Sequence, residues 1–209
     1  MIIRIEDLSK TIKGVNVLEH INLELSSGSI YGVVGQNGSG KTMLLRAIAG
    51  LIQPTSGNVY IDDKQLHKEL SFPPEMGILI EKPELLNHLT GMENLMLLAG
   101  IRNVVSKNQI GAYMKRFDLD PASPKTVKKY SLGMKQKLGI IQAIMEAPEL
   151  MILDEPFNAL DEATVQMLYK MFKEYKEAGK LLILTSHHKD DIEMLCDKII
   201  KLQEGKIIV

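Results

Sequence analysis

The sequence predicts an α/β fold that combines a mostly parallel sheet, an N-terminal antiparallel β region and an inserted helical subdomain. Two near-continuous apolar runs, at residues 150–153 and 181–184, are typical of parallel strands that are covered on both faces. Residues 1–34 instead alternate like strands, with Ile21, Leu23 and Leu25 spaced at period two, and residues 29–34 read as a buried strand. From about residue 84 to residue 146 the apolar residues recur at helical spacing, so we expect helices there.

The composition narrows the class of protein. The chain has 209 residues, of which 45% are hydrophobic and 24% charged, as in an ordinary globular protein. Its net charge of −1 implies no overall attraction to nucleic acid or anionic lipid. Cys196 is the only cysteine, which excludes an internal disulfide and is typical of a reducing cytosol. Acidic Glu6 and Asp7 argue against a signal peptide, and no apolar run approaches the roughly 18 residues of a spanning helix. We therefore expect another chain to cross any membrane at which this protein works.

Apolar spacing and turn residues predict the elements of the first eighty residues. In order, these are strands at 3–8, 21–25 and 29–34, a helix at 43–49, and short strands at 58–61 and 77–80. Gly50 is expected to end the helix, and Phe72-Pro73-Pro74 to break the chain between the last two strands.

Helices are expected in the middle of the chain. Thr90 and Glu93 have the spacing of a capping box, which predicts a helix through Leu98. A second helix is expected at residues 111–117. A third is opened by residues 130–134 and ended by Pro148.

The final part of the chain returns to strands. The predicted elements are a strand at 150–153, a helix capped by Asp161 and ended near Gly179, a strand at 181–184 and a hairpin at 199–208. We expect one domain over residues 1–209, with a nucleotide-binding core at 1–82 and 147–209 and a helical subdomain at about 83–146.

The loop between the strand at 29–34 and the following helix matches the P-loop pattern G-x-x-x-x-G-K-[ST] at every fixed position. Its glycines let backbone N–H groups point inward, and the helix N-terminus adds partial positive charge, so the loop can bind phosphates. The expected nucleotide contacts are Gly35, Gln36, Asn37, Gly38, Ser39, Gly40, Lys41, Thr42 and Met43. We expect Lys41 to reach the β- and γ-phosphates of ATP and the Thr42 hydroxyl to ligate Mg²⁺. The alternative is a glycine-rich turn with a chance lysine, but the strand and helix around it favour a P-loop NTPase core.

Two further strand ends carry polar residues. Asp154 follows the apolar run at 150–153, where it can hold Mg²⁺ or its water, and Glu155 can activate an attacking water. The alternative is a pair of exposed acids. His187 follows the run at 181–184 and can hydrogen-bond the γ-phosphate, whereas His188 is read as an ordinary surface histidine.

The segment Tyr130-Ser131-Leu132-Gly133-Met134 stands where ATP-binding-cassette (ABC) proteins have their signature motif LSGGQ. It departs at three of five positions but keeps Ser131 and Gly133. With the P-loop and the Asp154 strand in the expected order, essentially the whole chain resembles the ATPase subunit of an ABC transporter.

The resemblance implies that two such domains pair head to tail with ATP between them. Ser131 and Gly133 then act in trans at the partner's nucleotide, and Asp161 belongs to a loop that links the two sites. Glu155 resembles the catalytic glutamate and His187 the switch histidine. The expected partners are a transmembrane permease subunit and a second nucleotide-binding domain, identical or different, with no nucleic acid. The expected location is cytoplasmic, on the inner face of the cell membrane through the permease.

Two positions depart from the family pattern. Ile12 stands where an aromatic ring usually stacks on adenine, so adenine would meet aliphatic contacts such as Ile12 and Val17. Glu81 replaces a glutamine that senses Mg²⁺ or the attacking water. It can still ligate the metal, and the segment at 80–83 is similar to bacitracin- and lantibiotic-exporter ATPases. The alternative for Glu81 is an exposed acid before a turn.

The sequence therefore predicts a Mg²⁺-dependent ATPase that powers a separate exporter of a drug, peptide or lipid-like compound. One rival is an ATPase of the same family with a non-transport role. Another is a nucleotide-gated scaffold, against which the intact Glu155 and His187 argue.

Overall fold

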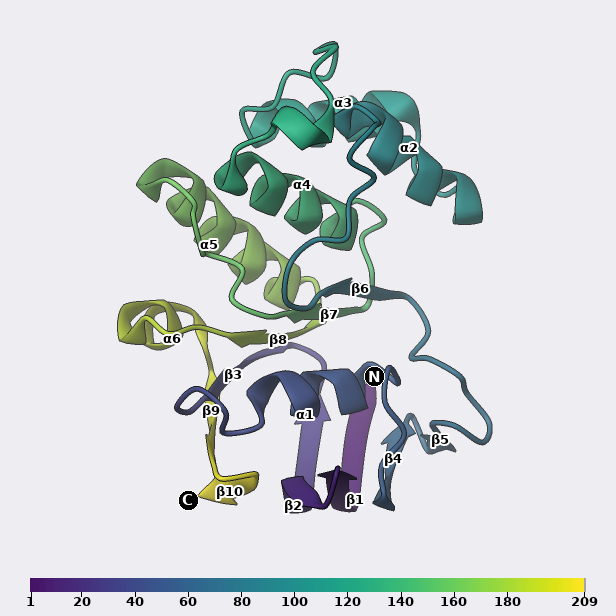
Figure 1. Ribbon diagram of the computed structural model, residues 1–209, viewed down its shortest axis with the longest axis vertical. Coiled ribbons are helices and arrows are strands. Elements are labelled where there is room, and N and C mark those ends of the chain that lie inside the picture. Colours follow the sequence, from purple (N-terminus) through teal and green to yellow (C-terminus); the bar gives the residue numbers. More distant parts are fainter. Residues whose placement is uncertain (209) are drawn as a thin grey trace.

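The computed structural model describes residues 1–208, which form two sheets with helices between and above them (Figure 1). One sheet is antiparallel, in the order β2-β1-β4-β5, and consists of β1 (Ile2–Ile12), β2 (Val15–Ser26), β4 (Ser56–Ile61) and β5 (Lys64–Gln65). The other has the order β10-β9-β3-β8-β7-β6 and is parallel except for β10. Its strands are β3 (Ser29–Val34), β6 (Met76–Leu79), β7 (Leu150–Leu153), β8 (Leu181–Thr185), β9 (Lys198–Gln203) and β10 (Lys206–Ile208). The predicted fold class is confirmed.

The helices occupy three places in Figure 1. Helix α1 (Lys41–Ile48) lies between the two sheets, and α2 (Gly91–Arg102), α3 (Lys107–Arg116) and α4 (Leu132–Ile144) gather at the top. Helices α5 (Glu162–Glu177) and α6 (Lys189–Leu195) lie along the side, and a 3₁₀ turn, η1 (Val127–Lys129), precedes α4. Among residues 1–208, no helix combines the length and the hydrophobicity that crossing a membrane requires.

The central strands explain why their sequences are apolar at every position. In β7, Met151 and Leu153 pack with the upper helices, whereas Leu150 and Ile152 pack on the other face with α1 and the antiparallel sheet. Strand β8 divides in the same way, and all of its residues are buried. Since both faces are covered, polar side chains first become possible where these strands end.

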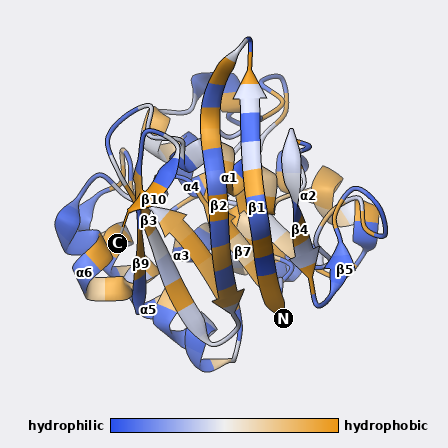
Figure 2. Ribbon diagram, turned by 90° about the horizontal axis from the view of Figure 1, so that it is seen from below, coloured by the Kyte–Doolittle hydropathy of each residue, from blue (hydrophilic) through white to orange (hydrophobic). Residues whose placement is uncertain are grey.

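The antiparallel strands show the expected alternation. Figure 2 shows hydrophilic and hydrophobic residues taking turns along β1 and β2. Ile3 and Ile5 pair with Leu25 and Leu23, and Ile3, Ile5 and Leu25 are buried in the cluster that contains α1. This sheet therefore covers α1 on the side away from the parallel sheet.

Several element boundaries differ from the predictions. Strands β1 and β2 are longer than the predicted 3–8 and 21–25 because they pair with each other out to Ile12 and Val15. Local hydrogen bonds extend two helices. Helix α2 begins with the predicted Thr90–Glu93 capping box but runs past Leu98 to Arg102, where Asn103 takes a left-handed φ of 55° and bonds Ala99 O. Helix α3 begins before residue 111 because Ser106 and Gln109 form a second capping box. Helix α6 was not predicted, since it is a single short amphipathic stretch.

Candidate functional site

The loop after β3 has the geometry of an anion cradle. Gly38 and Gly40 adopt φ values of +79° and +105°, which L-residues rarely take, and a Cβ on Gly40 would lie 2.7 Å from Val17 O. Gly40 is also the N-cap of α1, where no side chain accepts from the first-turn N–H groups. These donors and the positive end of the helix remain available for a phosphate.

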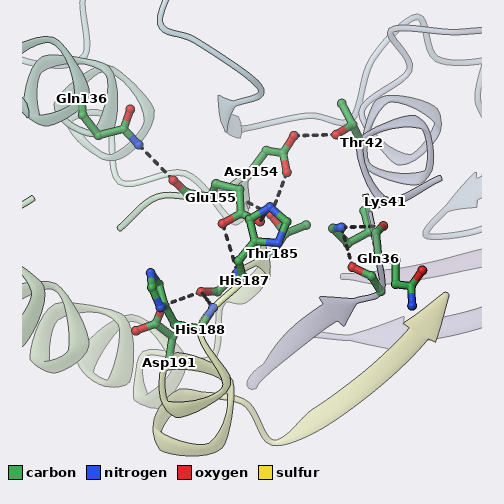
Figure 3. A network of polar contacts seen from close by, with 12 residues as sticks. Gln36, Lys41, Thr42, Gln136, Asp154, Glu155, Thr185, His187, His188 and Asp191 are labelled. Atoms are coloured by element: carbon green, nitrogen blue, oxygen red, sulfur yellow. Dashed lines mark hydrogen bonds and ion pairs between the residues drawn. The ribbon is translucent and has the colours of Figure 1, made fainter. Parts of the chain in front are cut away.

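Lys41 points back over this loop (Figure 3). The residue is only 8% exposed, and its Nζ donates to Gly35 O at 2.7 Å and to Gln36 O at 3.2 Å. A phosphate oxygen would be a stronger acceptor for the ammonium than either carbonyl. The Lys41 ammonium therefore already lies beside the loop that would bind the phosphates.

Asp154 joins α1 to the end of the parallel sheet. Thr42 Oγ1 donates to Asp154 Oδ2 at 2.8 Å, and Thr185 Oγ1 donates to Asp154 Oδ1 at 2.7 Å. The carboxylate is buried, so both oxygens have fixed directions. Mg²⁺ at nucleotide sites usually takes one or two protein oxygens besides phosphates and water, and this hydroxyl–carboxylate pair fits that requirement.

Glu155 is held in a strained turn after β7. Its φ is 51°, and its N–H donates to Thr185 Oγ1 at 2.8 Å. Its Oε2 accepts from the His187 N–H at 3.1 Å, and its Oε1 lies 3.1 Å from His187 Nε2. Burial raises the pKa of the Glu155 carboxyl, although His187 opposes this shift. The pair thus places a potential proton acceptor at the same sheet edge as Asp154 (Figure 3).

His188 does not share this arrangement. Its N–H donates to Ser186 Oγ at 3.0 Å, and Ser186 bonds Asp191, which also accepts from Tyr169. This buried polar network ties α5 and α6 to the loop that carries His187. These contacts are consistent with the prediction that His188 is an ordinary surface histidine.

The residues expected to act in trans form a separate group around the start of α4. Ser131 caps this helix by accepting from Met134 N at 3.2 Å, and its side chain is exposed. A Cβ on Gly133 would lie 2.5 Å from Ala159 O, so only glycine fits there. Asp161 caps α5 and pairs with Lys137 at 2.9 Å, and these contacts lower the pKa of Asp161.

The two departures from the family pattern, Glu81 and Ile12, lie in different parts of the fold. Glu81 takes a φ of 58° and its Oε1 lies 2.9 Å from Arg46 Nη2, so the carboxylate is directed toward α1. Metal ligation would require it to leave Arg46. Ile12 lies at the β1–β2 hairpin opposite Val15 and is 36% exposed, whereas the Val17 carbonyl borders Gly40.

Sequence reasoning missed three contributors to this site. Thr185 holds both Asp154 and Glu155, and the available signal was a hydroxyl residue that ends the apolar run beside β7. Gln136 donates to the backbone carbonyl of Glu155, and no residue spacing distinguishes it from Gln142, the other glutamine of α4. Arg46 could be found only from its contact with Glu81.

The fold and the loop geometry define a P-loop nucleotide-binding protein. A family profile described as ABC transporter matches residues 18–158. The chain therefore belongs to the ABC transporter family.

Similar proteins indicate the subgroup of the family. The chain is 44% identical to an uncharacterised ABC transporter ATP-binding protein, YybJ, of Bacillus subtilis (strain 168), over 98% of this chain and 94% of the relative. It is 36% identical to the bacitracin transport ATP-binding protein BcrA of Bacillus licheniformis, over 99% of this chain and 68% of the relative. It is 31% identical to the lantibiotic transport ATP-binding protein SrtF of Streptococcus pyogenes, over 99% and 89%. The predicted resemblance to this subgroup is confirmed.

Solved structures of similar fold belong to the same family. An ATP-binding subunit of an ABC transporter is 28% identical, with a TM-score of 0.91 over 100% of this chain and 89% of that chain. A dimeric bacterial ABC transporter cassette is 25% identical, with a TM-score of 0.88 over 99% and 97%. The chain is thus an ATP-binding subunit of an ABC transporter, and an ATPase of that family.

Proposed function

We propose that this chain hydrolyses ATP with Mg²⁺ as one half of a dimer and powers a membrane-spanning permease that exports a drug, peptide or lipid-like compound. One observation carries the proposal. The side chains that phosphate binding, metal binding and water activation require lie together at one edge of the parallel sheet: Lys41, Thr42, Asp154, Glu155 and His187. The names of the bacitracin and lantibiotic relatives support export as the direction of transport.

Each residue has a role that follows from its position. Lys41 and the N-terminus of α1 stabilise negative charge on the β- and γ-phosphates. Thr42 and Asp154 would hold Mg²⁺, which when bound neutralises charge on the phosphate oxygens. Glu155 orients a water for in-line attack on the γ-phosphorus and accepts its proton. His187 holds the Glu155 carboxylate and can donate a ring N–H to the γ-phosphate from the side opposite Lys41.

The second half of the site comes from a partner domain. Ser131 is exposed at a helix N-terminus, and its hydroxyl proton stays free because its oxygen accepts from Met134 N. It therefore suits a γ-phosphate held by another domain, with Gly133 allowing close approach and Asp161 linking the sites. The dimeric cassette among the similar structures supports this pairing.

The surface beside Glu81 is proposed to bind the permease. A groove of about 520 Å³ lies between β6 and α2. Leu97, Leu98 and Ile101 line it and are 54%, 38% and 75% exposed, a dense group of apolar side chains for a free surface. A cytoplasmic loop of the permease would cover them and hold this chain at the inner face of the membrane. The grouping of α2, α3 and α4 at the top of Figure 1 supports the proposed division into core and helical subdomain.

Co-purification from native membranes in a gentle detergent tests the transport role. The Glu155→Gln variant with ATP is the bait, because slow hydrolysis keeps the ATP-bound dimer. Recovery of a multispanning protein supports the proposal. Recovery of a ribosome or nucleic acid would favour the non-transport ATPase. Wild-type protein that binds ATP without releasing phosphate would favour a nucleotide-gated scaffold.

Ile12→Tyr is expected to tighten ATP binding about fivefold, since a stacked ring adds roughly 1 kcal/mol. Equilibrium titration with a fluorescent ATP analogue measures the dissociation constant. Ile2→Tyr, at the other end of β1 and 49% exposed, is the matched control and should change nothing. Equal affinity of wild type and Ile12→Tyr would remove Ile12 from the adenine site.

Glu81 is proposed to exchange Arg46 for the metal during turnover. Glu81→Gln should then raise the Mg²⁺ concentration needed for half-maximal hydrolysis, and Arg46→Gln should lower it by releasing the carboxylate. Both variants should lower the free energy of unfolding by less than about 1 kcal/mol, because the Glu81 side chain is 59% exposed. An unchanged Mg²⁺ dependence in both proteins would leave Glu81 as a surface acid.

A further inference from the structure

Gln136 has a buried side-chain amide that contacts the backbone of the turn at residues 155–156. It lies on α4, five residues after Ser131, and is 7% exposed. Its Nε2 donates to Glu155 O at 3.1 Å (Figure 3). The same nitrogen donates to Pro156 O, also at 3.1 Å. Both partners are carbonyls, so the amide nitrogen must face them.

Two side chains hold the turn at residues 155–156 by hydrogen bonds. Thr185 holds the N–H of Glu155, and Gln136 holds the two carbonyls that follow. The left-handed φ of Glu155, 51°, persists only where neighbouring groups enforce it. A change in the position of Gln136 would therefore alter the backbone from which the Glu155 carboxylate extends.

Helix α4 also contacts the segment after Glu155 at two other points. Gly133 lies against Ala159 O, and Lys137 pairs with Asp161 at 2.9 Å. Within this chain, the first turns of α4 and residues 155–161 are thus joined at three places. A displacement of the start of α4 would therefore move the turn at residues 155–156 as well, because Ser131 and Gln136 are separated by only about 7.5 Å along one helix.

We propose that Gln136 is a positioning residue that couples the two nucleotide sites of the dimer. Resting on the proposed function, Ser131 binds the nucleotide of the partner domain while Glu155 serves the nucleotide of its own. Gln136 connects these two roles inside one chain. When Ser131 binds the nucleotide of the partner domain, Gln136 then positions the Glu155 carboxylate at the nucleotide of its own domain.

Gln136→Met tests this link, since it keeps the side-chain length and removes the donor. Phosphate release is measured against ATP concentration, together with ATP affinity and the thermal midpoint. We expect kcat to fall about 10- to 100-fold and the Hill coefficient to approach 1, with ATP affinity unchanged. Gln136→His keeps one ring N–H donor and should recover part of the rate.

Tyr175→Phe is the matched control. Tyr175 donates its hydroxyl to Pro148 O at 2.7 Å, at the opposite end of β7, so this variant also removes a partly buried side-chain bond to a backbone carbonyl. It should lower the midpoint by a similar amount and keep wild-type kcat and cooperativity.

The outcomes separate this inference from the proposed function. If the wild-type protein releases no phosphate, the proposed function falls and the coupling falls with it. If the wild type hydrolyses ATP but Gln136→Met behaves like Tyr175→Phe, only the coupling is overturned. A non-cooperative wild type, or a rate loss that merely follows the loss of folded protein, would also overturn it.

Discussion

Replacing Glu155 with glutamine should reduce the rate of phosphate release by about 100-fold or more while ATP binding persists. The amide keeps the size of the side chain but cannot take the proton of the attacking water. Lys41, the P-loop and Asp154 remain in place to hold the nucleotide. The measurements are steady-state phosphate release and equilibrium ATP binding on the same preparation. Because the bound ATP is no longer consumed, size-exclusion chromatography should also show more dimer with ATP than for wild type.

The control for this variant is Glu149→Gln. Glu149 lies just before β7, at the end opposite Glu155, and pairs with Lys180 at 3.6 Å on the surface. Its rate should equal that of wild type. A Glu155→Gln protein that retains more than about a tenth of the wild-type rate would contradict the role of Glu155 as proton acceptor.

Replacing Gly77 with alanine should destabilise the fold by about 3 kcal/mol. The added Cβ would lie 1.9 Å from Ala143 O and 2.8 Å from Pro148 Cγ, where β6 packs against the end of α4. Neither obstacle is the flexible end of a side chain, so strand and helix must separate inside the core. For a chain of this size the thermal midpoint should drop by about 6 to 12 °C, as calorimetry would measure.

Gly100→Ala provides the comparison. Gly100 lies in α2, and nothing stands within 4 Å of the position of its added Cβ. Alanine favours the helix there by up to about 1 kcal/mol, so the midpoint should rise slightly. Equal thermal midpoints for Gly77→Ala and wild type would contradict this prediction, because they would show that β6 and α4 can separate at little cost in free energy.

The features that were predicted correctly are local in sequence. The P-loop, its preceding strand and its following helix occupy consecutive residues, so their pattern contains the whole anion cradle. The capping box at Thr90 and Glu93 spans a single turn, and Asp161 caps the helix that follows it directly. The continuous apolar runs of β7 and β8 predicted burial on both faces and hence where the polar strand ends would gather.

The sequence by itself determined the fold class, the order of the elements and the residues that end the central strands. The tertiary structure alone decided how those residues are held. Thr185 reaches Asp154, Gln136 reaches the carbonyl of Glu155, and Arg46 turns Glu81 toward α1. These contacts join residues 19 to 35 positions apart in the chain. Periodicity reports burial and local hydrogen bonding, but the partner of a polar side chain depends on how separate elements pack, which no local pattern specifies.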